Sequence, residues 1–197
     1  ALCCWEHLQP LSKYAMYAQD EQVHIAAWPS FSLYRGGAHA LGAEVNTAAS
    51  RIYAVEGQCF VVPPCATVSK EMVALLCGDD PTKRQLLLEG GGYAGIYAPD
   101  GRLLTEPLPE HTEGLVHAEL DLGLITLAKA AADPAGHYSR PDVTRLLLDK
   151  TPRDRVVLAP QRPPGAGAGA AEAAPPPSAA SPGDPAAAGP STARRTA

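Results

Sequence analysis

Residues 41–64 read LGAEVNTAASRIYAVEGQCFVVPP, and this stretch decides the fold class. Its first part carries apolar residues at helical spacing, namely Leu41, Val45, Ala48, Ala49, Ile52 and Val55. Gly57 lies just past the expected helix end. The apolar run 59–62 follows at once and stops at two prolines, as expected of a buried strand. A helix that leads directly into a buried strand indicates a layered α/β protein.

The residues before this stretch predict the same succession of a helix and a strand. Pro10 suits the first turn of a helix, and the apolar spacing predicts that this helix runs to about Gln19. Residues 23–28 are short and apolar and end at Pro29, which predicts a strand buried on both faces. Two helix–strand pairs in succession predict an α/β architecture.

The second half of the sequence predicts further elements. Residues 93–97 and 102–105 flank a Pro- and Gly-containing turn at 98–101, which predicts a hairpin. We expect a strand at 115–120, a helix at 121–132 and a last strand at 143–148. Gly90–Gly95 fits the letters G-x-G-x-x-G, but a hairpin follows it instead of a helix. It therefore predicts a turn with positive φ angles, not a nucleotide-binding loop.

Composition divides the chain at about residue 158. Residues 159–197 contain 14 Ala, 9 Pro and 5 Gly and no Val, Ile, Leu, Met or aromatic residue, which predicts a disordered tail. Residues 1–158 have the size of one domain. The net charge of −5 without a basic stripe argues against nucleic-acid binding. No apolar run reaches the length of a membrane helix, and no signal peptide is evident, so we expect a cytoplasmic protein.

Cysteine and histidine spacing predicts no metal site. The five cysteines are odd in number and form no C-x-x-C pair, so reduced thiols are expected. No H-E-x-x-H motif is present. His24 lies within an apolar strand and is expected to be a hydrogen-bonded core residue, whereas His39 and His111 are expected in exposed loops.

Functional side chains are most concentrated at Cys4-Trp5-Glu6-His7, where a thiol, an indole, a carboxylate and an imidazole follow one another in the sequence. A reactive cysteine needs a nearby cation, base or backbone N–H groups that favour its thiolate. A thiol between a strand end and a helix that opens at Pro10 would meet free N–H donors. From the residues alone, a reactive thiol and a buried cysteine beside a core tryptophan are equally compatible with this sequence.

The Cys4–Leu11 stretch resembles the signature around the nucleophile of nitrilases, a branch of the carbon–nitrogen hydrolase superfamily. Four later stretches are similar to family blocks in register: 23–32 with its Trp28-Pro29, 50–61, 90–101 and 133–142 with His137. The resemblance covers residues 1–158 and leaves out only the tail.

This resemblance implies part of a four-layer α-β-β-α sandwich and the conversion of a nitrile and two waters into a carboxylic acid and ammonia. It makes Cys4 the nucleophile, through a thioimidate and a thioester, and requires no cofactor. Trp5 N–H is a candidate donor to the nitrile nitrogen. Glu6 and His7 are expected to orient the Cys4 turn. Trp28 and Pro29 are expected to wall the pocket, and His137 to tune the site or a subunit contact.

The family's catalytic Glu, Lys and second Glu lie before the nucleophile, where this sequence has only Ala1, Leu2 and Cys3. Glu6 and Lys13 do not match those positions. We therefore expect a C-terminal half with the N-terminal half missing, inactive by itself and homo-oligomeric when complete. Two alternatives stay open: a relative that acts on cyanide, and a catalytically silent fragment with a role in assembly. The nitrile itself, whether aliphatic, arylacetic or aromatic, is not specified by these residues.

Overall fold

The computed structural model describes residues 1–151 and 156. In chain order its elements are β1 (Leu2–Cys3), the 3₁₀ helix η1 (Cys4–Leu8), α1 (Pro10–Tyr17), β2 (Val23–Ala27), the 3₁₀ helix η2 (His39–Leu41), α2 (Ala43–Gly57), β3 (Phe60–Val62), α3 (Lys70–Cys77), α4 (Pro81–Leu86) and α5 (Gly123–Ala131). The predicted disordered tail, residues 159–197, lies outside the described residues. None of the described helices is long and apolar enough to cross a membrane.

The three strands form a parallel sheet in the order β1-β2-β3. Cys3 stands opposite Ala27, and Ile25 stands opposite Val62. Because all three strands run the same way, their carboxyl ends meet at one edge of the sheet, where ligands of open α/β sheets bind. The predicted α/β class is therefore confirmed, as are the helix after Pro10, the helix before Gly57 and both strands that follow them.

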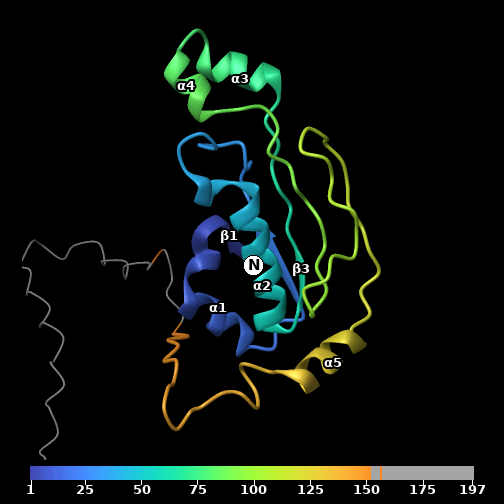
Figure 1. Ribbon diagram of the computed structural model, residues 1–197. Helices are drawn as coiled ribbons and strands as arrows, with labels where there is room; N and C mark the ends of the chain where they lie inside the picture. The colour runs from blue at the N-terminus through green and yellow to red at the C-terminus, as the bar shows by residue number, and fades with distance from the viewer. Residues whose placement is uncertain (152–155, 157–197) are drawn as a thin grey trace, which may run out of the picture. The chain divides into compact units, whose positions relative to one another are not determined.

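Helices α1 and α2 cover one face of the sheet (Figure 1). His24 and Ala26 of β2 point into this core, where Tyr53 and Ala54 of α2 are fully buried. On the other face, Phe60 of β3 packs against Ala98 and α5.

The expectation that residues 23–28 are buried on both faces is wrong for β2. Val23 and Ile25 point away from the helices and are 39% and 40% exposed, respectively. Among the strands of the described residues, only β3 has side chains fully buried on both faces, because α2 covers Val61 and α5 covers Phe60.

Beyond β3 the predictions succeed in part. The hairpin is confirmed by an antiparallel bridge between Tyr97 and Leu103, and Gly101 has a φ of +83° in its turn. The helix expected at 121–132 is α5. Gly90 and Gly91 have the predicted positive φ angles, +93° and +84°. The predicted turn is wrong, because Gly90 forms an antiparallel bridge with Val68 and residues 91–96 are irregular.

The strands predicted at 115–120 and 143–148 are wrong. Neither stretch pairs with another strand, and Leu115 and Leu147 are 94% and 96% exposed. An extended stretch becomes a strand only when a neighbour satisfies its backbone groups. Conversely, α3 and α4 form where no element was expected; Figure 1 shows them as a helical pair beyond the first turn of α2.

Candidate active site

Cys4 lies at the turn from β1 into η1, at the carboxyl edge of the sheet. Its φ is +47°, a left-handed conformation that is uncommon for residues other than glycine. Such strain persists where the surrounding structure imposes it, and it is concentrated at functional sites. The Cys4 residue is partly buried, whereas the preceding Cys3 is exposed.

Side-chain hydrogen bonds fix the backbone on both sides of η1. The carboxylate of Glu6 accepts a hydrogen bond from the Cys3 N–H at 2.7 Å. The Gln9 side chain accepts from Leu11 N–H at 3.0 Å and so caps α1. Trp5 is 43% exposed, and its N–H, as the second of η1, has no acceptor within that helix.

Beneath the turn, His7 is almost fully buried. Its Nδ1 lies 2.7 Å from the carbonyl oxygen of Cys4. The imidazole stacks on the Trp28 indole, with ring centroids 4.8 Å apart. The Trp28 Nε1–H in turn donates to Ser50 of α2 at 2.8 Å. These contacts attach the Cys4 turn to the core between β2 and α2.

A second buried imidazole extends the contact into the core. His24 of β2 places its Nε2 3.0 Å from that of His7, and its Nδ1 lies 2.8 Å from the Glu21 carboxylate. The Tyr53 hydroxyl donates to the same carboxylate at 2.7 Å. The His24 ring also stacks on Tyr53, with centroids 3.8 Å apart.

The electrostatics of this group follow from its burial and hydrogen bonds. Burial alone would raise the pKa of Glu21, but the hydrogen bonds from His24 and Tyr53 outweigh it and hold that pKa below its usual value. Burial lowers the pKa of His7, partly offset by the hydrogen bond to the Cys4 carbonyl. At neutral pH, Glu21 is therefore an ionised acceptor.

Lys13 does not face this turn. Its ammonium group pairs with Glu56 of α2 at 2.6 Å, and Tyr17 donates to the same carboxylate at 3.0 Å. Burial and the neighbouring Glu56 raise the pKa of Tyr17, so its hydroxyl stays protonated and can donate. This group is a structural tie between α1 and α2.

The structure gathers Cys4, Trp5, Glu6, His7 and Trp28 at one place. Trp28 is 5% exposed and supports the turn from below, while Pro29 is exposed at the carboxyl edge. His137 is exposed and lies beside Tyr138, which lines a groove on α1 with Leu11 and Tyr14. Roles for Pro29 in a pocket and for His137 in the site stay predictions.

Sequence reasoning identified His24 as a core residue, and its burial and hydrogen bonds confirm this. It missed that His24, Glu21 and Tyr53 connect directly to the Cys4 turn. The available signal was the spacing of Glu21 and His24, three residues apart where a polar loop enters an apolar strand. Tyr53 carried no signal, because its contact crosses from α2 to the loop before β2.

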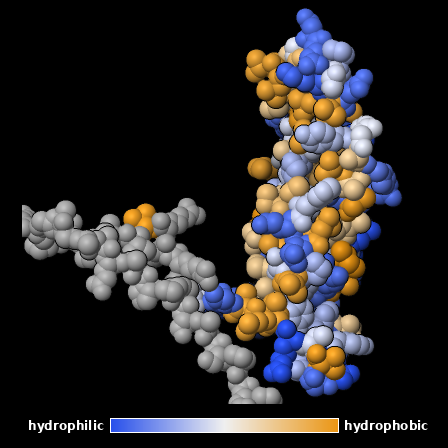
Figure 2. Space-filling model, turned by 90° about the vertical axis from the view of Figure 1, so that its left-hand side faces the viewer, coloured by the Kyte–Doolittle hydropathy of each residue, from blue (hydrophilic) through white to orange (hydrophobic). Residues whose placement is uncertain are grey.

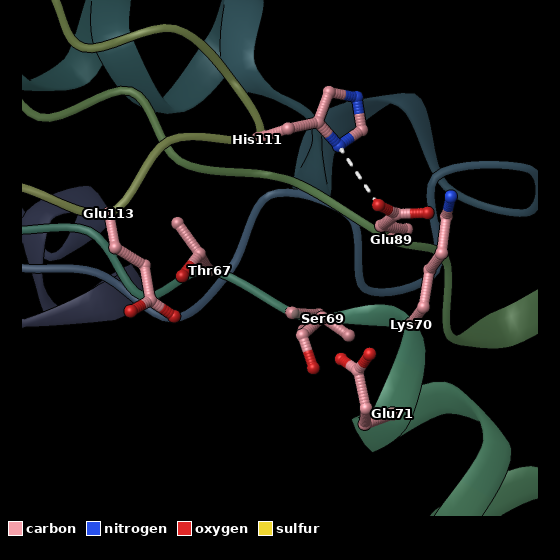
Figure 3. Close-up of a pocket in the computed structure, with 8 residues that line it drawn as sticks. Thr67, Ser69, Lys70, Glu71, Glu89, His111 and Glu113 are labelled. Carbon is pink, nitrogen blue, oxygen red and sulfur yellow. Dashed lines mark ion pairs between the residues drawn. The ribbon is translucent and has the colours of Figure 1, made fainter.

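A separate polar hollow of about 190 Å³ lies at the start of α3 (Figure 3). Glu71, Glu89, Glu113, Lys70 and His111 are among its lining side chains, and His111 faces Glu89 at 3.9 Å. Within the described part of the chain, no group of three or more His, Cys, Asp or Glu side chains could hold a metal ion. The hollow contains no nucleophile of the kind found at Cys4.

Ligands of open α/β sheets bind at the carboxyl edge, and Cys4 presents its thiol at that edge on left-handed backbone. The family model for carbon–nitrogen hydrolases matches residues 1–130. This chain belongs to that family.

Comparison with curated proteins gives high identities. The chain is 67% identical over 163 residues to a nitrilase of Pseudomonas syringae pv. syringae (strain B728a), which covers 83% of this chain and 48% of that enzyme. It is 57% identical over 150 residues to an arylacetone-specific nitrilase of Alcaligenes faecalis, covering 76% and 42%. It is 55% identical over 148 residues to an aliphatic nitrilase of Rhodococcus rhodochrous, covering 75% and 39%. The chain thus spans somewhat less than half the length of these relatives.

Solved structures support the fold. The carbon–nitrogen hydrolase from Helicobacter pylori G27 superposes with a TM-score of 0.53 at 14% identity, covering 74% of this chain and 49% of that one. The C. elegans NitFhit protein superposes with a TM-score of 0.51 at 18% identity, covering 79% and 32%.

Proposed function

We propose that the protein containing this chain is a nitrilase that hydrolyses an aliphatic or arylacetic nitrile to a carboxylic acid and ammonia, with Cys4 as the nucleophile. The observation that carries the proposal is the position of Cys4, on left-handed backbone where β1 enters η1. Its neighbours match the nitrilase motif, and the relatives with 55–67% identity are nitrilases.

The chemistry proceeds through two intermediates on one sulfur. The Cys4 thiolate adds to the nitrile carbon, and a proton goes to the nitrogen to give a thioimidate. One water then replaces the nitrogen, so that ammonia leaves and a thioester remains. A second water releases the carboxylic acid and restores the thiol. Backbone N–H groups at the start of η1 suit the negative charge that develops on nitrogen.

A general base and a cation are also needed, and the resemblance assigns them to Glu and Lys residues outside the matched motif. The contacts of Glu6 and Lys13 support this assignment. Glu6 accepts from the Cys3 backbone and Lys13 pairs with Glu56, so neither side chain is free to replace them. We further propose that the complete protein forms the four-layer sandwich and the homo-oligomer that the resemblance implies.

Ammonia release tests the proposal directly. The protein is produced from its own gene with every residue that precedes Ala1 retained, and aliphatic and arylacetic nitriles are supplied. We expect ammonia and the acid in equal amounts, loss of turnover in Cys4→Ala, and retention in Cys3→Ala, the matched control with the adjacent thiol. A mass adduct on Cys4 is expected with a slow substrate. Turnover of cyanide alone, or activity that survives Cys4→Ala, contradicts the proposal.

A further inference from the structure

An unbroken path of hydrogen-bonded side chains runs from the Glu21 carboxylate to the backbone of the nucleophile. Glu21 contacts His24 Nδ1 at 2.8 Å, the two histidine Nε2 atoms are 3.0 Å apart, and His7 Nδ1 contacts the Cys4 carbonyl at 2.7 Å. His7 is 2% exposed and His24 is 0% exposed, so water has little access to this path.

The two ends of the path fix its proton content. A carbonyl oxygen only accepts, so His7 Nδ1 carries a hydrogen. An ionised carboxylate only accepts, so His24 Nδ1 also carries one. The two remaining Nε2 atoms face each other at hydrogen-bond distance, which requires one hydrogen between them. The imidazole pair therefore bears one positive charge, balanced by Glu21.

The hydrogen bond from His7 also sets the direction of a neighbouring donor. The peptide that joins Cys4 and Trp5 is planar and trans, so its carbonyl and its N–H point in opposite directions. With the carbonyl held toward His7 in the core, the Trp5 N–H points away from the core. Trp5 itself is 43% exposed, so that side of the turn is open.

We propose that Glu21, His24 and His7 act as a positioning relay, in which one proton shared by the imidazoles locks the Cys4–Trp5 peptide plane and aims the Trp5 N–H at the nitrile nitrogen. The aiming step rests on the proposed function, whereas the shared proton does not. These three side chains touch neither substrate nor sulfur, so they position a catalytic donor and are not themselves catalytic residues.

The charged groups around the relay are few. Tyr53 donates to Glu21, and Glu6 and Lys13 act on His7 from neighbouring turns. The Glu21 carboxylate contacts the His24 ring directly, so its negative charge lies at the His24 end of the imidazole pair. The relay is thus an ion pair between Glu21 and the two imidazoles, which share one positive charge.

Nitrogen-15 NMR of histidine-labelled protein tests the shared proton, with signals assigned through His7→Asn. At pH 7 we expect three of the four ring nitrogens of His7 and His24 to carry protons. A count of two protonated nitrogens would mean two neutral rings beside a neutral Glu21 and would overturn the relay. A count of four would mean two charged rings with no shared proton and would overturn it as well. In Glu21→Gln the count is expected to fall to two, because the balancing charge is removed. This measurement requires no nitrile.

Kinetics test the positioning. Asn at position 7 can present its amide nitrogen where His7 presents Nδ1, whereas the longer Gln cannot, so His7→Asn should retain much more activity than His7→Gln. Glu21→Gln should lower kcat on the order of 10-fold to 100-fold with little change in KM, because donor alignment matters in the transition state. The matched control is Glu56→Gln. Glu56 accepts a hydrogen bond from the buried Tyr17, as Glu21 does from Tyr53, but Glu56 lies outside the relay.

Alkylation of Cys4 by iodoacetamide separates positioning from general damage. We expect its rate to stay within about 2-fold of the unaltered protein in His7→Asn and Glu21→Gln, because the thiol stays in place. Equal loss of kcat in His7→Asn and His7→Gln, or in Glu21→Gln and Glu56→Gln, would overturn the positioning role. If the unaltered protein hydrolyses no nitrile, the proposed function fails, while the ring-nitrogen count still decides the shared proton.

Discussion

The backbone of Cys4 combines a functional thiol with an unfavourable conformation. Its φ of +47° costs a residue with a Cβ on the order of 1 kcal/mol, and glycine avoids this cost. We expect Cys4→Gly to be more stable than Cys4→Ala by about 1 kcal/mol, measured by urea unfolding, although both lack the thiol. The same exchange at Cys3, whose backbone is extended, should favour alanine. Equal stabilities at position 4 would mean that the turn relaxes without strain.

Glu21 should make stability depend on pH in the acid range. Its pKa in the folded protein lies below the usual 4.5, so the unfolded chain takes up the proton first as pH falls. The stabilisation from Glu21 is therefore complete above pH 4.5 and is lost as pH falls through its lowered pKa. The melting temperatures of the unaltered protein and of Glu21→Gln should differ most near neutral pH and converge below pH 4.5. A constant difference across this range would contradict the assignment.

At the scale of elements, prediction succeeded where a local pattern decides the structure. The helix before β3 is specified by its apolar face and by Gly57, and β3 by an apolar run between that glycine and two prolines. The hairpin turn is specified by Pro99 and Gly101. These signals act over a few residues, so they can be recognised without knowledge of tertiary contacts.

Prediction failed where distant partners decide. The stretches 115–120 and 143–148 have strand-like composition but no neighbouring strand.

Helices α3 and α4, in contrast, have caps that the sequence itself shows, because Ser69 accepts from Met72 N–H and Asp80 accepts from Thr82 and Lys83 N–H. Such caps are local signals for the start of a helix. At the site, the motif identified Cys4 and His7, but the link to Glu21 and Tyr53 forms only when the loop before β2 packs on α2.

At Gly57, at the end of α2, side-chain packing overrides the general preference of helices for alanine over glycine. Alanine favours helices by about 0.5–1 kcal/mol over glycine. A Cβ at position 57, however, would lie 2.7 Å from the Tyr17 ring, which the hydrogen bond to Glu56 holds in place. We expect Gly57→Ala to lose about 1–2 kcal/mol in urea unfolding. Gly36→Ala, whose nearest contact is 3.8 Å, should change little. A stabilised Gly57→Ala variant would show that Tyr17 can move aside.

At the scale of the whole molecule, apolar side chains are not confined to the core. Figure 2 shows them among hydrophilic residues on the side that carries α1. On the sheet itself, Val23 and Ile25 point outward from β2 and are about two-fifths exposed. Exposed apolar patches of this kind promote self-association. The 197-residue chain alone should therefore bind dyes that report apolar surface.

Ile25→Thr tests the origin of that surface. Threonine keeps the branched Cβ that suits a strand but removes apolar area, so dye fluorescence and light scattering should both fall. Ile125→Thr, at a buried position on α5, should instead lower stability without lowering dye binding. Unchanged fluorescence in Ile25→Thr would place the dye elsewhere.

The bridge between Val61 and Tyr97 has a consequence for synthesis on the ribosome. The N–H and C=O of Val61 both pair with Tyr97, which shields the outer edge of β3. Tyr97 is translated about 35 residues after β3, a delay on the order of 2–7 seconds at ordinary elongation rates. During that interval the nascent chain presents an open β edge to its neighbours on the same messenger. Codons that slow translation between these two segments would lengthen the period in which the unfinished protein can aggregate.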